Sequence, residues 1–118
     1  LVQHLKGIVH GQGLFAVLHS LGSHYKYNLR YPKEANYYTP SLSTNDGYAM
    51  LTEDHKDLLI NSYDNSIRYT DYVLGELIEW MDSLNQPTVL MYISDHGESF
   101  WDDERKLSLH GSYELSEA

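Results

Sequence analysis

Two short and uninterrupted apolar runs stand out in a chain of otherwise mixed polarity. They are 14–18 (LFAVL) and 89–93 (VLMYI), and each is preceded by a turn-forming or helix-breaking residue, Gly13 or Pro87. A continuous apolar run of this length is typical of a strand that is covered on both faces. We therefore expect Leu14–Leu18 and Val89–Ile93 to be strands of one parallel sheet.

A helical pattern lies between these two runs. Thr52, Glu53 and Asp54 have the composition of a helix start, a hydroxyl cap followed by two acids. Apolar residues then recur at spacings of three and four until Pro87 ends the pattern. We expect a helix of about thirty residues, roughly 45 Å long, with a kink or break near 64–66 as an open alternative. Its expected apolar face consists of Leu59, Tyr63, Ile67, Leu74, Leu77, Ile78 and Met81.

A strand, a helix and a second strand form a βαβ unit, in which both strands end at the same edge of the sheet. Residues 19–50 are rich in Gly, Ser, Asn, Tyr and Pro and predict a long loop after the first strand. Loops of this length in a compact domain are more often functional than idle. The predicted fold class is therefore α/β.

Composition narrows the possible functions. The 118 residues include 42% hydrophobic residues, which supports a globular domain or part of one. The net charge of −9 argues against a nucleic-acid partner, because binding to phosphates depends on clustered Lys and Arg. The chain has no cysteine, so any metal must be held by His and carboxylate groups. Neither apolar run is long enough to cross a bilayer.

Candidate metal ligands directly follow the second predicted strand. Asp95 and His96 are adjacent oxygen and nitrogen ligands that suit Zn²⁺ or Mn²⁺. We expect Gly97 to let the backbone turn so that both side chains face the ion. The alternative is that Asp95 caps the next segment and His96 is an ordinary surface residue. The sequence around Ser99 lacks the final glycine of a nucleophile elbow, which disfavours a serine hydrolase.

Two further histidines lie where they could reach the same place. His24 follows the first predicted strand, and His110 lies in Leu109-His110-Gly111. Each could bind an ion or an anion near Asp95. By spacing alone, a loop or packing role is the favoured interpretation of each histidine.

Several motifs together resemble one family. The motifs are, in order, Leu18–His24 (LHSLGSH), Arg30–Pro32 (RYP), Asn61–Ile67 (NSYDNSI), Ser94–Ser99 (SDHGES) and Leu109–Gly111 (LHG). Over about residues 13–111, this set resembles the phosphoethanolamine transferases of the sulfatase and alkaline-phosphatase superfamily.

The resemblance implies a fold and a set of roles. The fold is a sulfatase-like sandwich with a mostly parallel central sheet and helices on both faces, and residues 1–118 are a C-terminal-side fragment of that catalytic domain. Asp95 and His96 match the paired ligands of one or two Zn²⁺ ions, with Mn²⁺ as an alternative. His24 and His110 match catalytic histidines that bind the substrate phosphate or a second zinc. Glu98 is a neighbour without an assigned role.

The resemblance also implies an activity. Family members transfer phosphoethanolamine from a phospholipid to lipid A or the lipopolysaccharide core, at the periplasmic face of the bacterial inner membrane. The reaction passes through a phospho-enzyme on a threonine. No threonine here matches that nucleophile, so we expect a membrane segment and the nucleophile outside this chain, and an inactive fragment. Tyr25-Lys26-Tyr27 follows His24 where much of the family has Gly-Pro, which leaves the acceptor open. The alternatives are a sulfatase, a phosphoglycerol transferase, or a non-catalytic ligand-binding domain of the same fold.

Overall fold

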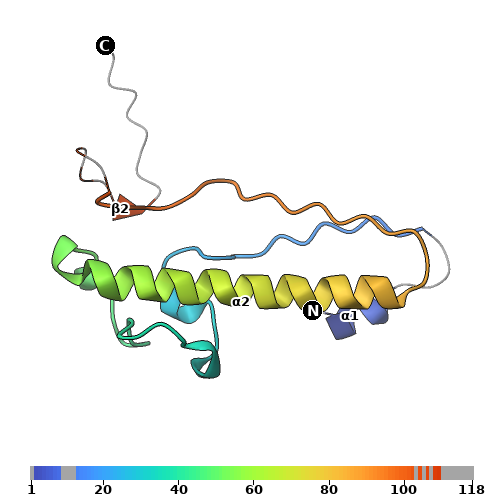
Figure 1. Ribbon diagram of the computed structural model, residues 1–118, viewed down its shortest axis with the longest axis horizontal. Helices are drawn as coiled ribbons and strands as arrows, with labels where there is room; N and C mark the ends of the chain where they lie inside the picture. Colours follow the sequence, from blue (N-terminus) through green and yellow to red (C-terminus); the bar gives the residue numbers. More distant parts are fainter. Residues whose placement is uncertain (1, 9–12, 103, 105, 107, 110–118) are drawn as a thin grey trace, which may run out of the picture.

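One long helix organises the molecule. The computed structural model describes residues 2–8, 13–102, 104, 106, 108 and 109. In Figure 1 the long helix α2 (Lys56–Ser83) forms the axis along which the other segments lie. The remaining elements are α1 (Val2–Lys6), η1 (Tyr27–Leu29), η2 (Lys33–Ala35), η3 (Tyr48–Met50), η4 (Glu53–His55), β1 (Ser99–Phe100) and β2 (Ser108–Leu109).

The predicted long helix is confirmed. It runs for 28 residues without interruption, about 42 Å, so the alternative of a break at 64–66 is wrong. A single 3₁₀ turn, η4, leads into it. The hydroxyl of Thr52 bonds to Nδ1 of His55 at 2.7 Å and makes no cap to a backbone N–H, so the expected capping is not what starts the helix. No helix in the described ranges is long and apolar enough to cross a membrane.

The two predicted strands are extended segments without a ladder, and in this respect the strand prediction is wrong. Within the described part of the chain, neither 14–18 nor 89–93 makes a backbone hydrogen bond. The side chains of Phe15 and Val89 are 90% and 91% exposed. An apolar strand becomes a strand only when neighbours satisfy its backbone and cover its side chains. The described residues do not provide those neighbours.

The direction of the two segments nevertheless agrees with a βαβ unit. Figure 1 shows both running back along α2 in the same direction, from its C-terminal end toward its N-terminal end. The long helix thus connects two extended segments of equal direction, as a crossover helix does between parallel strands. The connectivity was predicted correctly, and the pairing was not.

The observed sheet is small and antiparallel. β1 pairs with β2 through Ser99 opposite Leu109 and Phe100 opposite Ser108. Among the described residues it is the only sheet, so the mostly parallel central sheet with helices on both faces is absent from them. Two ion pairs connect this hairpin region to η4 and to the first residue of α2: Lys106 to Glu53 at 2.8 Å and Lys56 to Asp102 at 3.0 Å.

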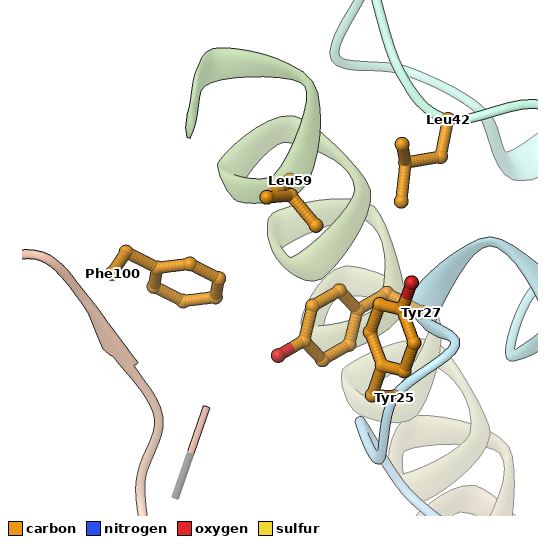
Figure 2. Packing of buried hydrophobic residues seen from close by; sticks show 5 residues of the cluster. All are labelled: Tyr25, Tyr27, Leu42, Leu59 and Phe100. Carbon is orange, nitrogen blue, oxygen red and sulfur yellow. The ribbon is translucent and has the colours of Figure 1, made fainter. Parts of the chain in front are cut away.

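The core is built around an aromatic side chain from the long loop. Tyr27 is fully buried, and Figure 2 shows it among Tyr25, Leu42, Leu59 and Phe100. Its ring centroid is 5.4 Å from that of Tyr25 and 5.9 Å from that of Phe100. Because Tyr25 and Tyr27 follow the first extended segment and Phe100 follows the second, this core joins the two regions where we expected the site.

The innermost face of α2 is polar at its middle, which the apolar-face prediction missed. Ser62, Asn65 and Ser66 are fully buried, whereas Ile67 and Ile78 are 45% and 47% exposed. The loop backbone crosses the helix here and needs hydrogen-bond partners. The Ser62 hydroxyl accepts a bond from the N–H of Leu42 at 2.8 Å and donates to the carbonyl oxygen of Leu58 at 2.7 Å.

Candidate functional site

Asp95 and His96 lie at the end of the second extended segment, in an exposed turn. The Ser94 hydroxyl donates to the His96 carbonyl oxygen at 2.7 Å, and the His96 N–H donates to Oδ1 of Asp95 at 3.0 Å. These two bonds close the turn and place both candidate ligands on it. Oδ2 of Asp95 is 3.8 Å from Nε2 of His96.

The imidazole of His96 is oriented by a backbone carbonyl. Nδ1 bonds to the carbonyl oxygen of Gly97 at 2.9 Å. A carbonyl only accepts, so Nδ1 is the protonated nitrogen and Nε2 carries the lone pair of the neutral ring. The Gly97 bond, with the charge of Asp95 as a smaller cause, raises the pKa of His96 above its usual value. A histidine held in this way by a carbonyl is typical of metal ligands.

The pair fits part of a zinc site. Two ligands of a tetrahedral Zn²⁺, each about 2.0–2.1 Å from the ion, are about 3.3–3.4 Å apart. The observed 3.8 Å between Asp95 Oδ2 and His96 Nε2 requires only a small adjustment. In the described part of the chain, no third His, Asp or Glu joins them to make a group that could hold a metal. These two side chains would therefore supply two ligands of such a site.

Gly97 contributes differently from our expectation. The structure gives it no left-handed φ, and a Cβ built at this position would meet nothing within 4 Å. Neither the turn nor its surroundings requires a glycine. The prediction that Gly97 provides the turn by its conformational freedom is therefore wrong, and it is the Gly97 carbonyl that orients the site.

His24 lies at the matching position after the first extended segment. Its Nδ1 bonds to the carbonyl oxygen of Tyr25 at 2.5 Å, so Nε2 carries the lone pair of the neutral ring, as in His96. His24 is exposed and does not belong to a group of three metal-type ligands with Asp95 and His96 in the described ranges. His110, the other candidate, lies outside the described residues.

The two loops meet through Tyr27 and Glu98. Burial raises the pKa of Tyr27 far above its usual value, and the charge of the Glu98 carboxylate adds to the shift. Burial also raises the pKa of Tyr63 on α2, and the charge of the same carboxylate is the second cause. Glu98 lies two residues after His96, and Tyr27 lies three residues after His24. The interaction of Glu98 with Tyr27 thus supports the prediction that both polar loops lie close together, although it involves neighbours of the candidate ligands and not the ligands themselves.

These buried phenols predict a loss of stability at high pH. The pKa of Tyr27 is higher in the folded chain than in the unfolded chain, so its contribution is complete below pH 10 and is lost as the pH rises above it. We expect the free energy of unfolding to fall above pH 10, by up to about 1.4 kcal/mol per pH unit for Tyr27. Urea unfolding between pH 8 and pH 11.5, followed by circular dichroism, measures this slope.

The control for this prediction is an exposed tyrosine of the same chain. Tyr27→Phe should flatten the alkaline slope, whereas Tyr72→Phe should leave it unchanged because Tyr72 is 59% exposed. Equal slopes for the unmodified protein and Tyr27→Phe would contradict the assignment.

Sequence patterns did not reveal the residues behind the site. The sequence assigned no role to Tyr27 or to Glu98, because their interaction joins positions about seventy residues apart. One signal was present: a carboxylate two residues after a predicted metal pair, and a tyrosine three residues after a predicted histidine, are candidates for supporting residues. This signal identifies the two residues as candidates, but it does not show that they interact with each other.

Comparisons with known proteins agree with the motifs. Residues 3–116 match the family model described as Sulfatase. Phosphoethanolamine transferase EptA of Salmonella typhimurium is 38% identical over 113 residues, covering 93% of this chain and 19% of that protein. The EptA protein of Helicobacter pylori is 37% identical over 101 residues, 85% of this chain and 18% of that protein.

The name of a third relative includes Kdo(2)-lipid A. Kdo(2)-lipid A phosphoethanolamine 7''-transferase of Escherichia coli K12 is 33% identical over 96 residues, 81% of this chain and 15% of that protein. The chain thus spans less than a fifth of the length of these relatives. No solved structure matches it.

Proposed function

Because the chain belongs to the sulfatase family, we propose that it is part of a metal-dependent phosphoethanolamine transferase. The reaction would move the phosphoethanolamine head group of a phospholipid to lipid A or the lipopolysaccharide core, through a phospho-enzyme intermediate. The transferred group and the lipid A acceptor follow the names of relatives that are phosphoethanolamine transferases, one of them of Kdo(2)-lipid A, and the phospholipid donor follows from the family resemblance. We place the reaction at the periplasmic face of the inner membrane.

The Asp95–His96 pair is the observation that carries this proposal. Phosphoryl transfer needs groups that offset the charge on the phosphate oxygens and activate a hydroxyl. Zn²⁺ supplies both when bound, since it lowers the pKa of a hydroxyl and attracts the phosphate oxygens. Asp95 Oδ2 and His96 Nε2, 3.8 Å apart, would provide two of its ligands, and the Gly97 carbonyl holds the ring for that task.

The histidines after the first segment and near the end of the chain complete the proposed site. With Nδ1 bonded to the Tyr25 carbonyl oxygen, Nε2 of His24 is the atom that would take up a proton, and the resulting Nε2–H would donate to a phosphate oxygen or protonate the leaving group. We assign the same role to His110. The number of zinc ions, one or two, and Mn²⁺ as a substitute follow from the superfamily and stay part of the proposal.

We further propose that residues 1–118 are a C-terminal-side part of the catalytic domain and are inactive alone. The exposed apolar side chains of 14–18 and 89–93 support this, because strands of such composition are covered on both faces in parallel sheets. In the complete domain these two segments would lie in the mostly parallel central sheet of the sulfatase-like sandwich.

A head-group transfer assay tests the function. Full-length protein that includes these residues is mixed with vesicles of fluorescently labelled phosphatidylethanolamine and with lipid A. We expect labelled lipid A with the full-length protein, no product from the 118 residues alone, and loss of product after chelation that added Zn²⁺ restores. Preference for phosphatidylglycerol or an aryl sulfate would instead favour another superfamily activity. Ligand binding without turnover would favour a non-catalytic domain.

A further inference from the structure

The side chain of Arg30 lies across the backbone that carries His24. Its Nε donates to the carbonyl oxygen of His24 at 2.8 Å, and its Nη2 donates to the carbonyl oxygen of Tyr25 at 3.2 Å. Its own N–H donates to the carbonyl oxygen of Tyr27 at 2.8 Å, which fixes it at the end of η1. The planar guanidinium therefore spans two consecutive carbonyls with a fork that a lysine cannot reproduce.

The carbonyl oxygen of Tyr25 is shared between Arg30 and the imidazole of His24. It accepts one bond from Nη2 of Arg30 and one from Nδ1 of His24, and its two lone pairs allow both. The Tyr25 side chain is buried, and its hydroxyl donates to the carbonyl oxygen of Gly47 at 3.1 Å. The shared carbonyl thus belongs to a residue whose side chain and backbone oxygen are both held by hydrogen bonds.

We propose that Arg30 is a positioning residue that holds His24, through the Tyr25 carbonyl, in the tautomer with Nδ1 protonated and Nε2 basic. The task of that Nε2 atom, which is to take up a proton and donate it to a phosphate oxygen or to the leaving group, rests on the proposed function. Arg30 itself points at backbone carbonyls and does not need to contact the substrate. The contacts among these three residues exist whatever the substrate is.

Nitrogen-15 NMR of ¹⁵N-histidine-labelled protein tests the tautomer directly. The signal of His24 is identified as the one that His24→Ala removes. We expect the ring of the unmodified protein at neutral pH to be protonated at Nδ1 in its neutral form. A neutral His24 ring that is protonated at Nε2 would overturn the proposal, without any variant of Arg30 having to fold.

Variants of Arg30 test the cause. In Arg30→Met we expect the ratio of Nδ1-protonated to Nε2-protonated ring to fall about tenfold, because the Tyr25 carbonyl loses the anchor that keeps it against His24 and the bond from Nδ1 is lost with it. Arg30→Lys should recover part of this ratio, because an ammonium reaches one carbonyl at a time. Lys33→Met, which removes a cation from the exposed turn η2, should leave the ratio unchanged. An unchanged ratio in Arg30→Met would overturn the role.

The transfer assay separates this inference from the proposed function. If both hold, Arg30→Met in the full-length protein lowers kcat about tenfold and changes the KM for the donor lipid less than about twofold. If no transfer occurs with any donor, the proposed function fails, while the tautomer ratio still decides the role of Arg30. A normal kcat alongside an altered tautomer would overturn the link between them.

Discussion

Replacing Asn65 by alanine is expected to lower the free energy of unfolding by about 3 kcal/mol. Asn65 is fully buried in the middle of α2. Its Oδ1 accepts bonds from the N–H groups of Tyr37 and Tyr38, at 2.9 Å and 2.8 Å, and its Nδ2 donates to the Tyr38 carbonyl oxygen at 2.9 Å and to Oδ1 of Asn36 at 2.8 Å. Alanine would remove four part-buried hydrogen bonds at once and leave a cavity where the fully buried amide packs.

Asn61 provides a matched control on the same helix. Its Nδ2 donates to the carbonyl oxygen of Pro40 at 2.8 Å at an exposed site, where water can replace it. We expect Asn61→Ala to cost less than about 1 kcal/mol. Urea denaturation of the three proteins gives the comparison, with similar m-values as the sign that only stability has changed. A loss in Asn65→Ala no larger than that in Asn61→Ala would contradict the anchoring role.

The contrast between the helix and the strands shows what local patterns can predict. The helix satisfies its own backbone, so periodicity and Pro87 were enough to predict 56–83 closely. The segments 14–18 and 89–93 also have a strand-like pattern, but a strand depends on partners from elsewhere in the chain or domain. Sequence therefore predicted where they run and could not establish their pairing.

The buried polar residues of α2 illustrate a second limit. Ser62 and Asn65 are polar residues outside the predicted apolar face. They are buried because the loop backbone at 36–42 passes over them and needs their side-chain oxygens. Whether a polar residue in a helix is solvated or bonded to a distant loop depends on tertiary structure, although the NSYDNSI motif marked the region.

The candidate site also contains residues that the sequence predicts and residues that it does not. Asp95 and His96 are adjacent in sequence, so their chemistry was visible before the structure was known. Arg30 acts six residues from His24 through backbone carbonyls, which accept equally well at every residue and leave no trace in the sequence. Supporting residues of this kind require coordinates, whereas the direct ligands do not.

Loss of either candidate metal ligand is expected to have the largest effect on activity. In the full-length transferase that we propose, Asp95→Ala and His96→Ala should each lower kcat/KM for head-group transfer by on the order of 10³-fold. A metal contributes several kcal/mol to such a reaction, and each 1.4 kcal/mol is a factor of ten. Zinc content, measured by mass spectrometry after dialysis, should fall in parallel. His19→Ala, another exposed histidine, is the control and should retain zinc and activity.

The same geometry predicts how the isolated chain behaves. Asp95 and His96 alone offer two ligands, and Zn²⁺ sites in proteins have three or four, so calorimetry on the 118 residues should find only weak zinc binding. The full-length protein should bind zinc tightly, since the remaining ligands would then be present. Tight stoichiometric binding by the isolated chain that disappears in His96→Ala would contradict a shared site and would mean that these residues complete it themselves. Transfer by full-length His96→Ala at the unmodified rate would instead remove the metal pair from the mechanism altogether.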